Sequence, residues 1–252
     1  MKLKSLCPFI TALVLWLFGQ TFLLYPHFFY FALFLGGLLI IFSVKYLAGK
    51  NEKKRWPLLT LSPLLFFLSF SWYVALIFNY YWIQFIFILI AWFVFAYLRN
   101  LYYYLTYQAP EREQKVDSLL LTGGFLTIFA VASVLYGLPI FLSWPFSILI
   151  LIFIPISFLL FIQFLSLRKI AFKTHSLFII LEVVVLAELA WALSLLPLNF
   201  NILGVILAIF YYLLLTILRF RLNNEPLGRN LRLPLIFSLI ILIILLLTSR
   251  WL

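Results

Sequence analysis

Residues 176–196 read SLFIILEVVVLAELAWALSLL, and the glutamates at positions 182 and 188 are the only charged side chains in this run. A helix rises about 1.5 Å per residue, so a run of this length matches a bilayer core about 30 Å thick. The run is apolar on every face and lacks the alternation of polar and apolar residues that a β-barrel strand would show. It therefore predicts a transmembrane helix.

The rest of the chain repeats this pattern. Hydrophobic residues make up 67% of the sequence and charged residues 10%, whereas soluble domains are about 45–50% apolar and about 25% charged. We predict an all-α polytopic integral membrane bundle of about nine helices, which form a single transmembrane domain over residues 1–252 with no soluble domain. The other eight predicted spans are 6–25, 28–47, 58–78, 80–98, 118–142, 145–167, 200–218 and 233–249.

The lysines and arginines lie in alternate connections between these spans. All of the 18 basic residues except Arg250 lie before the first span or in the connections after spans two, four, six and eight. Because insertion keeps short basic loops on the cytoplasmic side, we expect a cytoplasmic N-terminus and an external C-terminus. The net charge of +11 then indicates orientation and contact with anionic lipids of the bilayer, rather than a nucleic-acid site.

The N-terminal region predicts an uncleaved first span. Lys2 and Lys4 precede an apolar run that is too long for a signal peptide, and no small-residue cleavage site follows it. We expect the cytoplasmic membrane of a prokaryote, with a thylakoid or other organelle membrane as the alternative. Cys7 is the only cysteine, so the chain has no internal disulfide, and we expect this thiol to be inert.

Short external connections predict four antiparallel hairpins followed by one further helix. In spans three and four a tryptophan precedes an asparagine turn and the second helix ends at an arginine, and spans seven and eight repeat this order. The residues are Trp72, Asn79 and Arg99, and then Trp191, Asn199 and Arg219. This pattern favours either tandem hairpin copies or the convergence that short loops impose on any membrane protein.

Within the spans, Pro155 removes one backbone hydrogen bond, so it marks a hinge or a static bend. Small residues four apart allow close approach of neighbouring helices, and we expect them to form packing faces. These pairs are Ala32/Gly36, Ser133/Gly137 and Gly204/Ala208.

Glu182 and Glu188 are the only acidic residues inside a predicted span. An ionisable group there costs a few kcal/mol and is a functional candidate by default. Six residues at about 100° each place the two carboxyl groups about 120° apart around the helix, so they do not form a general acid/base pair. Glu182 lies in the inner half of the span, and Glu188 lies at or just beyond the midplane.

Other polar residues lie at the same two depths and are candidate partners. We expect Glu188 to face the bundle and to meet Gln20, Gln84 or a tyrosine hydroxyl. We expect Glu182 to meet Gln163 or to extend toward the basic loops. Either glutamate could instead be a protonated group that joins helices by hydrogen bonds. His27, in the first external turn, is a candidate proton-entry group.

The sequence contains no nucleotide-binding glycine loop, no His-Glu-x-x-His and no Gly-x-Ser-x-Gly motif, so it predicts no cofactor and no bound metal. Three functions stay open. The first is a small permease or transporter of lipids or small molecules, with Glu188 as the binding or coupling group. The second is a non-catalytic scaffold or subunit whose protein partners the sequence does not identify. The third is an intramembrane enzyme that uses Glu188 and His27, and overall the sequence leans away from an enzyme.

Overall fold

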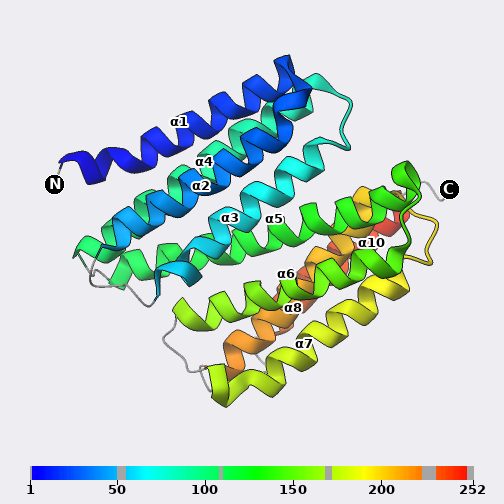
Figure 1. Ribbon diagram of the computed structural model, residues 1–252. Helices are drawn as coiled ribbons and strands as arrows, with labels where there is room; N and C mark the ends of the chain where they lie inside the picture. Colours follow the sequence, from blue (N-terminus) through cyan, green and yellow to red (C-terminus); the bar gives the residue numbers. More distant parts are fainter. Residues whose placement is uncertain (1, 50–54, 108–109, 168–171, 223–230, 249–252) are drawn as a thin grey trace. The chain divides into compact units, whose positions relative to one another are not determined.

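The computed structural model describes residues 2–49, 55–107, 110–167, 172–222 and 231–248, and these contain helices and turns but no strand (Figure 1). Eight helices are long and apolar enough to cross a membrane, and a ninth is shorter. This confirms the predicted all-α membrane bundle of about nine helices. The elements are α1 (Lys2–Leu24), η1 (Pro26–Phe28), α2 (Phe29–Ala48), α3 (Trp56–Val74), α4 (Tyr80–Tyr107), α5 (Pro110–Leu142), α6 (Phe146–Leu167), α7 (Phe172–Leu193), α8 (Phe200–Leu222) and α10 (Arg232–Thr248).

Asparagine caps begin the second helix of two hairpins. The Asn79 side-chain oxygen accepts a hydrogen bond from the backbone N–H of Tyr81 at 3.0 Å, at the start of α4. The Asn199 side-chain oxygen accepts one from the backbone N–H of Asn201 at 2.9 Å, at the start of α8. The first amides of a helix lack partners within the helix, so these caps allow the chain to reverse sharply.

The chain divides into two compact units. Unit 1 consists of Met1–Gly124 and Gln163–Ala171, and unit 2 consists of Phe125–Ile162 and Phe172–Leu252. Each unit therefore contains four long apolar helices or most of their length, and α10 belongs to unit 2. We describe each unit by itself, and the single transmembrane domain stays a prediction.

In unit 1, α1 packs against α2 and α4, and α3 packs against α2 and α4. Gly19 of α1 lies so close to the ring of Phe87 that a β-carbon there would overlap it. Phe66 of α3 stacks on Phe93 of α4 with 4.0 Å between ring centroids. Small residues and aromatic rings therefore fill the same helix interfaces, as expected where lipid offers no hydrophobic driving force between helices.

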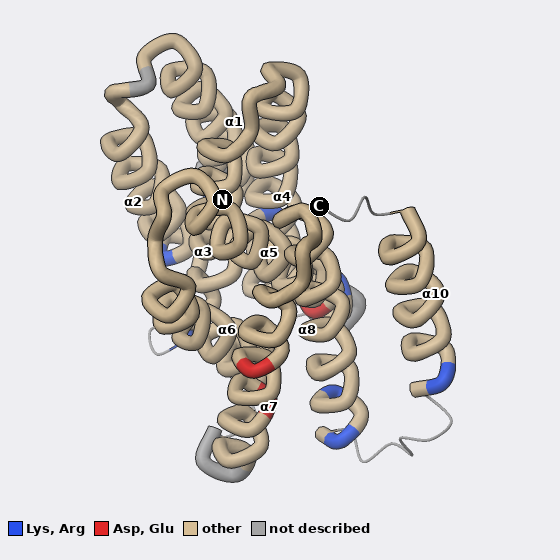
Figure 2. The backbone as a smooth tube through the Cα atoms, turned by 90° about the vertical axis from the view of Figure 1, so that its right-hand side faces the viewer, with Lys and Arg blue, Asp and Glu red and all other residues tan. Residues whose placement is uncertain are grey.

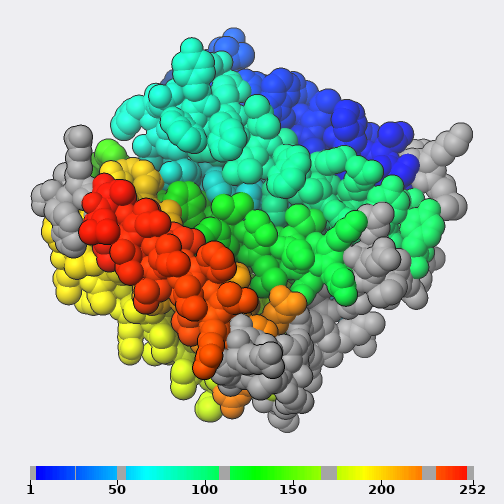
Figure 3. Space-filling view, turned by 180° about the vertical axis from the view of Figure 1, so that it is seen from behind, coloured from blue at the N-terminus to red at the C-terminus, as the bar shows by residue number. Residues whose placement is uncertain are grey.

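In unit 2, Gly204 of α8 lies directly against the backbone and side chain of Ser133 in α5. These two residues belong to predicted small-residue pairs, so the expected packing role is confirmed for both. The Tyr136 hydroxyl of α5 donates a hydrogen bond of 2.9 Å to the backbone oxygen of Ala190 in α7. Helix α10 packs on α8 and lies at the surface (red in Figure 3), and Ser238 is its one buried residue.

The two units share two packing contacts. In unit 1, Phe29 at the start of α2 meets Trp72 of α3 edge to face, with 6.0 Å between ring centroids. In unit 2, Phe146 at the start of α6 meets Trp191 of α7 at 5.9 Å. A glycine contact also joins the first and fourth helix of each unit. Both shared contacts join helices of different predicted hairpins, so the hairpin repeat stays a prediction.

In unit 2, basic residues lie at the end of α8 and at the start of α10 (Figure 2). In unit 1 the Lys4 ammonium lies 5.6 Å from the Tyr46 ring centroid, and the Lys45 ammonium lies 5.6 Å from that of Trp56. In unit 2 the last turn of α8 carries Arg219 and Arg221. The turns at the other end of these hairpins contain no Lys, Arg, Asp or Glu. The orientation of these ends in a membrane stays a prediction.

Candidate functional site

Glu182 is a buried carboxyl group in the middle of α7. Its residue is 2% exposed, and among the described residues neither carboxyl oxygen has a hydrogen-bond partner. The expected contact with Gln163 and the expected extension of Glu182 toward the basic loops stay predictions. A carboxyl group in apolar surroundings is strongly disfavoured unless it is neutral, paired with a cation or hydrogen-bonded.

Two residues of α8 lie close enough to interact electrostatically with Glu182. They are Tyr211, whose side chain is 2% exposed, and Arg221, at the end of the helix. The Arg221 guanidinium lies over the ring of Phe178, 4.3 Å from its centroid. Phe178 precedes Glu182 by one helical turn and lies on the same face of α7. Glu182 therefore has a cation one turn away and a buried phenol beside it.

Glu188 lies in different surroundings. It is exposed, and it lines an apolar groove of about 350 Å³ between α6 and α7. The expectation that it faces the interior of the bundle is wrong for the structure as described. The remaining lining residues are Ile150, Ile154, Val183, Val184, Ala187 and Trp191.

The groove lies at the depth of one lipid leaflet. Trp191 and Glu188 are two and five residues before the end of α7, so they lie about 3 and 8 Å from that end of the helix. Val183 lies about 15 Å from it, close to the middle of a bilayer core. The groove surface is apolar throughout, and Glu188 borders it about halfway between the end of α7 and the middle of the bilayer core.

Pro155 lies beside the groove-lining Ile154 in α6 and is exposed. Its ring nitrogen cannot donate the usual helical hydrogen bond to the backbone four residues earlier. The Ser157 hydroxyl donates to the backbone oxygens of Phe153 and Ile154, at 3.0 Å each. The serine thus satisfies carbonyl groups around the proline, and the hinge stays a prediction.

Gln20 and Gln84 bind each other rather than Glu188. The Gln20 amide nitrogen donates to the Gln84 oxygen at 2.8 Å, and the Gln84 nitrogen donates to the Gln20 oxygen at 2.9 Å. The Gln84 nitrogen also donates to the Tyr80 hydroxyl at 3.1 Å. This amide pair joins α1 to α4 in unit 1, so both residues act in helix packing.

Gln163 lies beside the Tyr97 hydroxyl in unit 1. Tyr97 is fully buried and donates a hydrogen bond of 2.7 Å to the backbone oxygen of Leu59. The amide nitrogen of Gln163 is buried without a hydrogen-bond partner among the described residues. Tyr97 and Gln163 therefore form a small polar cluster between buried apolar side chains.

The remaining candidates are peripheral. His27 is exposed in η1, where its role as a proton-entry group stays a prediction. Over the described ranges, no group of three or more metal-ligating side chains comes together. Cys7 is partly buried and lies 4.0 Å from the Thr11 hydroxyl.

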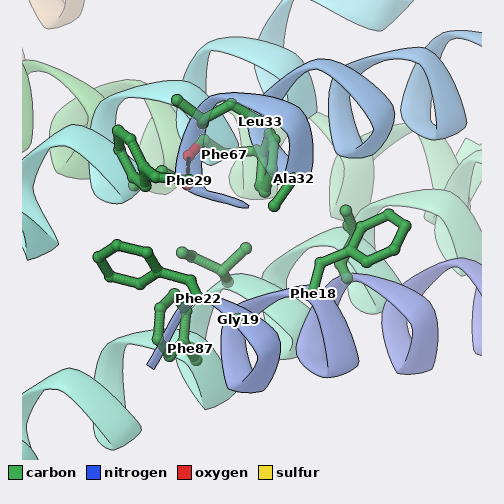
Figure 4. A pocket seen from close by; sticks show the side chains of 11 residues that line it. Phe18, Gly19, Phe22, Phe29, Ala32, Leu33, Phe67 and Phe87 are labelled. Atoms are coloured by element: carbon green, nitrogen blue, oxygen red, sulfur yellow. Dashed lines mark hydrogen bonds between the residues drawn. The ribbon is translucent and has the colours of Figure 1, made fainter. Parts of the chain in front are cut away.

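Unit 1 also contains a small cavity, of about 20 Å³, between α1, α2, α3 and α4 (Figure 4). Phenylalanines dominate its walls, including Phe18, Phe22 and Phe87 (Figure 4). Ser71 supplies the one polar side chain of the lining, and its hydroxyl already donates to the backbone oxygen of Phe67 at 2.7 Å. The cavity is too small and too apolar to hold a polar substrate.

Comparison of the chain with protein-family models, with curated proteins and with solved structures gives no match. The assignment of a function therefore depends on the geometry of the two glutamates.

Tyr211 and Arg221 are the residues of the candidate site that sequence reasoning missed. Arg221 belongs to a basic cluster that the topology already explains, so its charge carries no separate signal. The one available clue is the spacing of Phe178 and Glu182, which places an aromatic ring and a carboxyl group on one face of α7. The side of α8 that meets this face cannot be read from the sequence.

Proposed function

We propose that this protein is a small permease that binds a lipid with an amine-bearing headgroup in the groove between α6 and α7. The observation that carries this proposal is the single acidic residue, Glu188, among the residues that line an apolar groove of about 350 Å³. A groove on membrane-spanning helices is filled from the bilayer, and an apolar lining suits an acyl chain.

Charge complementarity selects the headgroup. A carboxylate beside the groove attracts an ammonium group and repels an anionic headgroup that carries no ammonium group. Trp191 lies beyond Glu188, near the end of α7, where an indole ring is stable at the membrane interface. The lipid would therefore place its ammonium group at Glu188 and its chain along Ile154 and Val183.

A scaffold is the second candidate function. Helix α10 favours it, because a single residue of this 17-residue helix is buried. An exposed apolar helix can pack against another membrane protein as well as against lipid. We rank the permease first because a scaffold needs neither the groove nor a carboxyl group in it.

The test is transbilayer movement of labelled lipids in vesicles that contain the purified protein. We expect faster movement of labelled phosphatidylethanolamine than of labelled phosphatidylglycerol, and a loss of at least several-fold for Glu188→Gln. Ala187→Trp should fill the groove and give the same loss. Leu177→Trp is the matched control, because Leu177 is 80% exposed on α7 and does not line the groove.

Movement no faster than in protein-free vesicles would contradict the permease. Equal rates for the two headgroups, with Glu188→Gln unchanged, would contradict the role of the carboxyl group. An equal loss for Ala187→Trp and Leu177→Trp would show that the groove has no special part.

A further inference from the structure

The Glu182 carboxyl group is buried beyond what helix packing requires. It is 2% exposed, and no residue in the described part of the chain forms a hydrogen bond with either of its oxygens. A hydrogen-bonding role between helices is therefore not what the geometry provides. A buried polar group without a partner is costly, and such a cost is usually retained for function.

The matching position in unit 1 carries no ionisable residue. Counted back from the matching tryptophans, Trp72 and Trp191, the turn that holds Glu182 in α7 corresponds to the turn with Ser62 and Pro63 in α3. Neither of these residues is ionisable, and unit 1 forms the same aromatic contact between its second and third helices. The aromatic contact between the second and third helices therefore forms without a carboxyl group at this position.

Few other groups in unit 2 can influence Glu182. Residues 125–142 of α5 and 146–162 of α6 contain no Asp, Glu, Lys, Arg or His, and the Tyr136 hydroxyl of α5 is bonded to Ala190. From α8, Tyr211 and Arg221 face Glu182. On α7 itself, His175 lies about two turns from Glu182, and the Glu188 side chain points about 120° away from that of Glu182 around the helix axis.

Arg221 is positioned as a movable counter-ion. Its guanidinium lies 4.3 Å from the centroid of Phe178, one turn from Glu182, and the residue is exposed at the end of α8. A long, flexible side chain can exchange a contact with an aromatic ring for a charge-assisted hydrogen bond. A small change of its rotamer would bring it toward the carboxyl group.

We propose that Glu182 is a proton-binding site that exchanges its proton with water at the end of unit 2 where Arg221 lies. When protonated, the carboxyl group is neutral and Arg221 stays on Phe178. When the proton leaves for water at that end, the carboxylate remains and Arg221 moves from the ring to pair with it. Rebinding of a proton reverses the exchange. This site is separate from the lipid groove and stands whether or not lipid movement is observed.

The test uses dicyclohexylcarbodiimide, an apolar reagent that adds to protonated carboxyl groups in membranes. The carboxyl proton passes to a carbodiimide nitrogen and the carboxylate adds to the central carbon, which leaves a stable adduct after rearrangement. Intact protein in nanodiscs is labelled from mildly acidic to mildly alkaline pH, and the modified residue is identified by peptide mass spectrometry. We expect modification of Glu182 that falls as the pH rises.

Two arginine variants test the counter-ion. Removal of the cation destabilises the ionised form, so Arg221→Ala should move the half-labelling pH upward by about 1. Arg221→Lys should return it toward the original value. Arg219→Ala is the matched control, because Arg219 is exposed on the same turn and should leave the profile unchanged.

Three results would overturn the proposal. They are no modification of Glu182 at any pH, modification that does not depend on pH, and equal shifts for the Arg221 and Arg219 variants. A water-soluble carbodiimide tests whether the protein is folded. If the protein were unfolded, this reagent would modify Glu182 together with the loop acids. The pH dependence of Glu182 labelling is measured on the wild-type protein. A folding defect in one variant therefore leaves this part of the test intact.

Discussion

The Gln20–Gln84 pair shows how single polar residues act within apolar helices. Each amide donates to the other, so neither can be removed without leaving a partly buried partner unsatisfied. We expect Gln20→Leu and Gln84→Leu each to destabilise unit 1, and the double variant to cost less than the sum of the two. Hydrogen bonds between membrane helices couple by about 0.6 kcal/mol each, so the coupling should be about 1 kcal/mol.

Reversible unfolding in mixed micelles, with the four members of the cycle compared, measures this coupling. Ser118→Ala is the control, because its hydroxyl is bonded within its own helix, to Gln114. Strict additivity of the two single changes would contradict the pairing.

The two glutamates show what residue patterns could and could not predict. Their spacing on a helix requires that they point in different directions, and the structure agrees: Glu182 is buried and Glu188 is exposed. Which of them faces the protein could not be predicted, because α7 is apolar all round and its pattern marks no inner side. That choice depends on contacts with α6 and α8, which are distant in sequence.

At the scale of the helices, close approach of α5 and α8 depends on Gly204. A β-carbon at this position would overlap the Ser133 hydroxyl and lie 3.0 Å from the backbone oxygen of Phe129, which cannot move aside as a side chain can. We therefore expect Gly204→Ala to destabilise the protein by about 1–3 kcal/mol, as overpacking does. Thermal unfolding in nanodiscs measures the change.

Gly37→Ala is the matched control for this substitution. The nearest atom to a β-carbon there is a methyl group of Leu64 at 3.4 Å, which is ordinary contact. This variant should be neutral, or stabilised by up to about 1 kcal/mol because alanine favours helix. Equal effects at positions 37 and 204 would contradict the close α5–α8 interface.

Helix positions could be predicted well, and helix lengths less well. The predicted span 80–98 lies within α4, which continues to Tyr107, and the span 118–142 lies within α5, which starts at Pro110. Hydropathy marks the part of a helix that lies in lipid, whereas backbone hydrogen bonds continue the helix beyond it. The start at Pro110 could be predicted separately, from a proline in the first turn followed by acidic residues.

At the scale of the whole chain, the presence of four long apolar helices in each unit has a topological consequence. Four crossings return the chain to the side where it began, so both units should begin on the same side of the membrane. The basic end of each unit is then on that side, in agreement with the charge distribution along the sequence. We expect helix α10 to add one further crossing, although its 17 residues span about 26 Å and would have to fit a slightly thinner core.

The most direct test of this membrane arrangement is a pair of reporter fusions, one after Leu222 at the end of α8 and one after Leu252. We expect a fluorescent cytoplasmic reporter to be active after Leu222, and alkaline phosphatase, which folds outside the cytoplasm, to be active after Leu252. Phosphatase activity after Leu222, or cytoplasmic fluorescence with no phosphatase activity after Leu252, would contradict nine crossings with the basic ends inside.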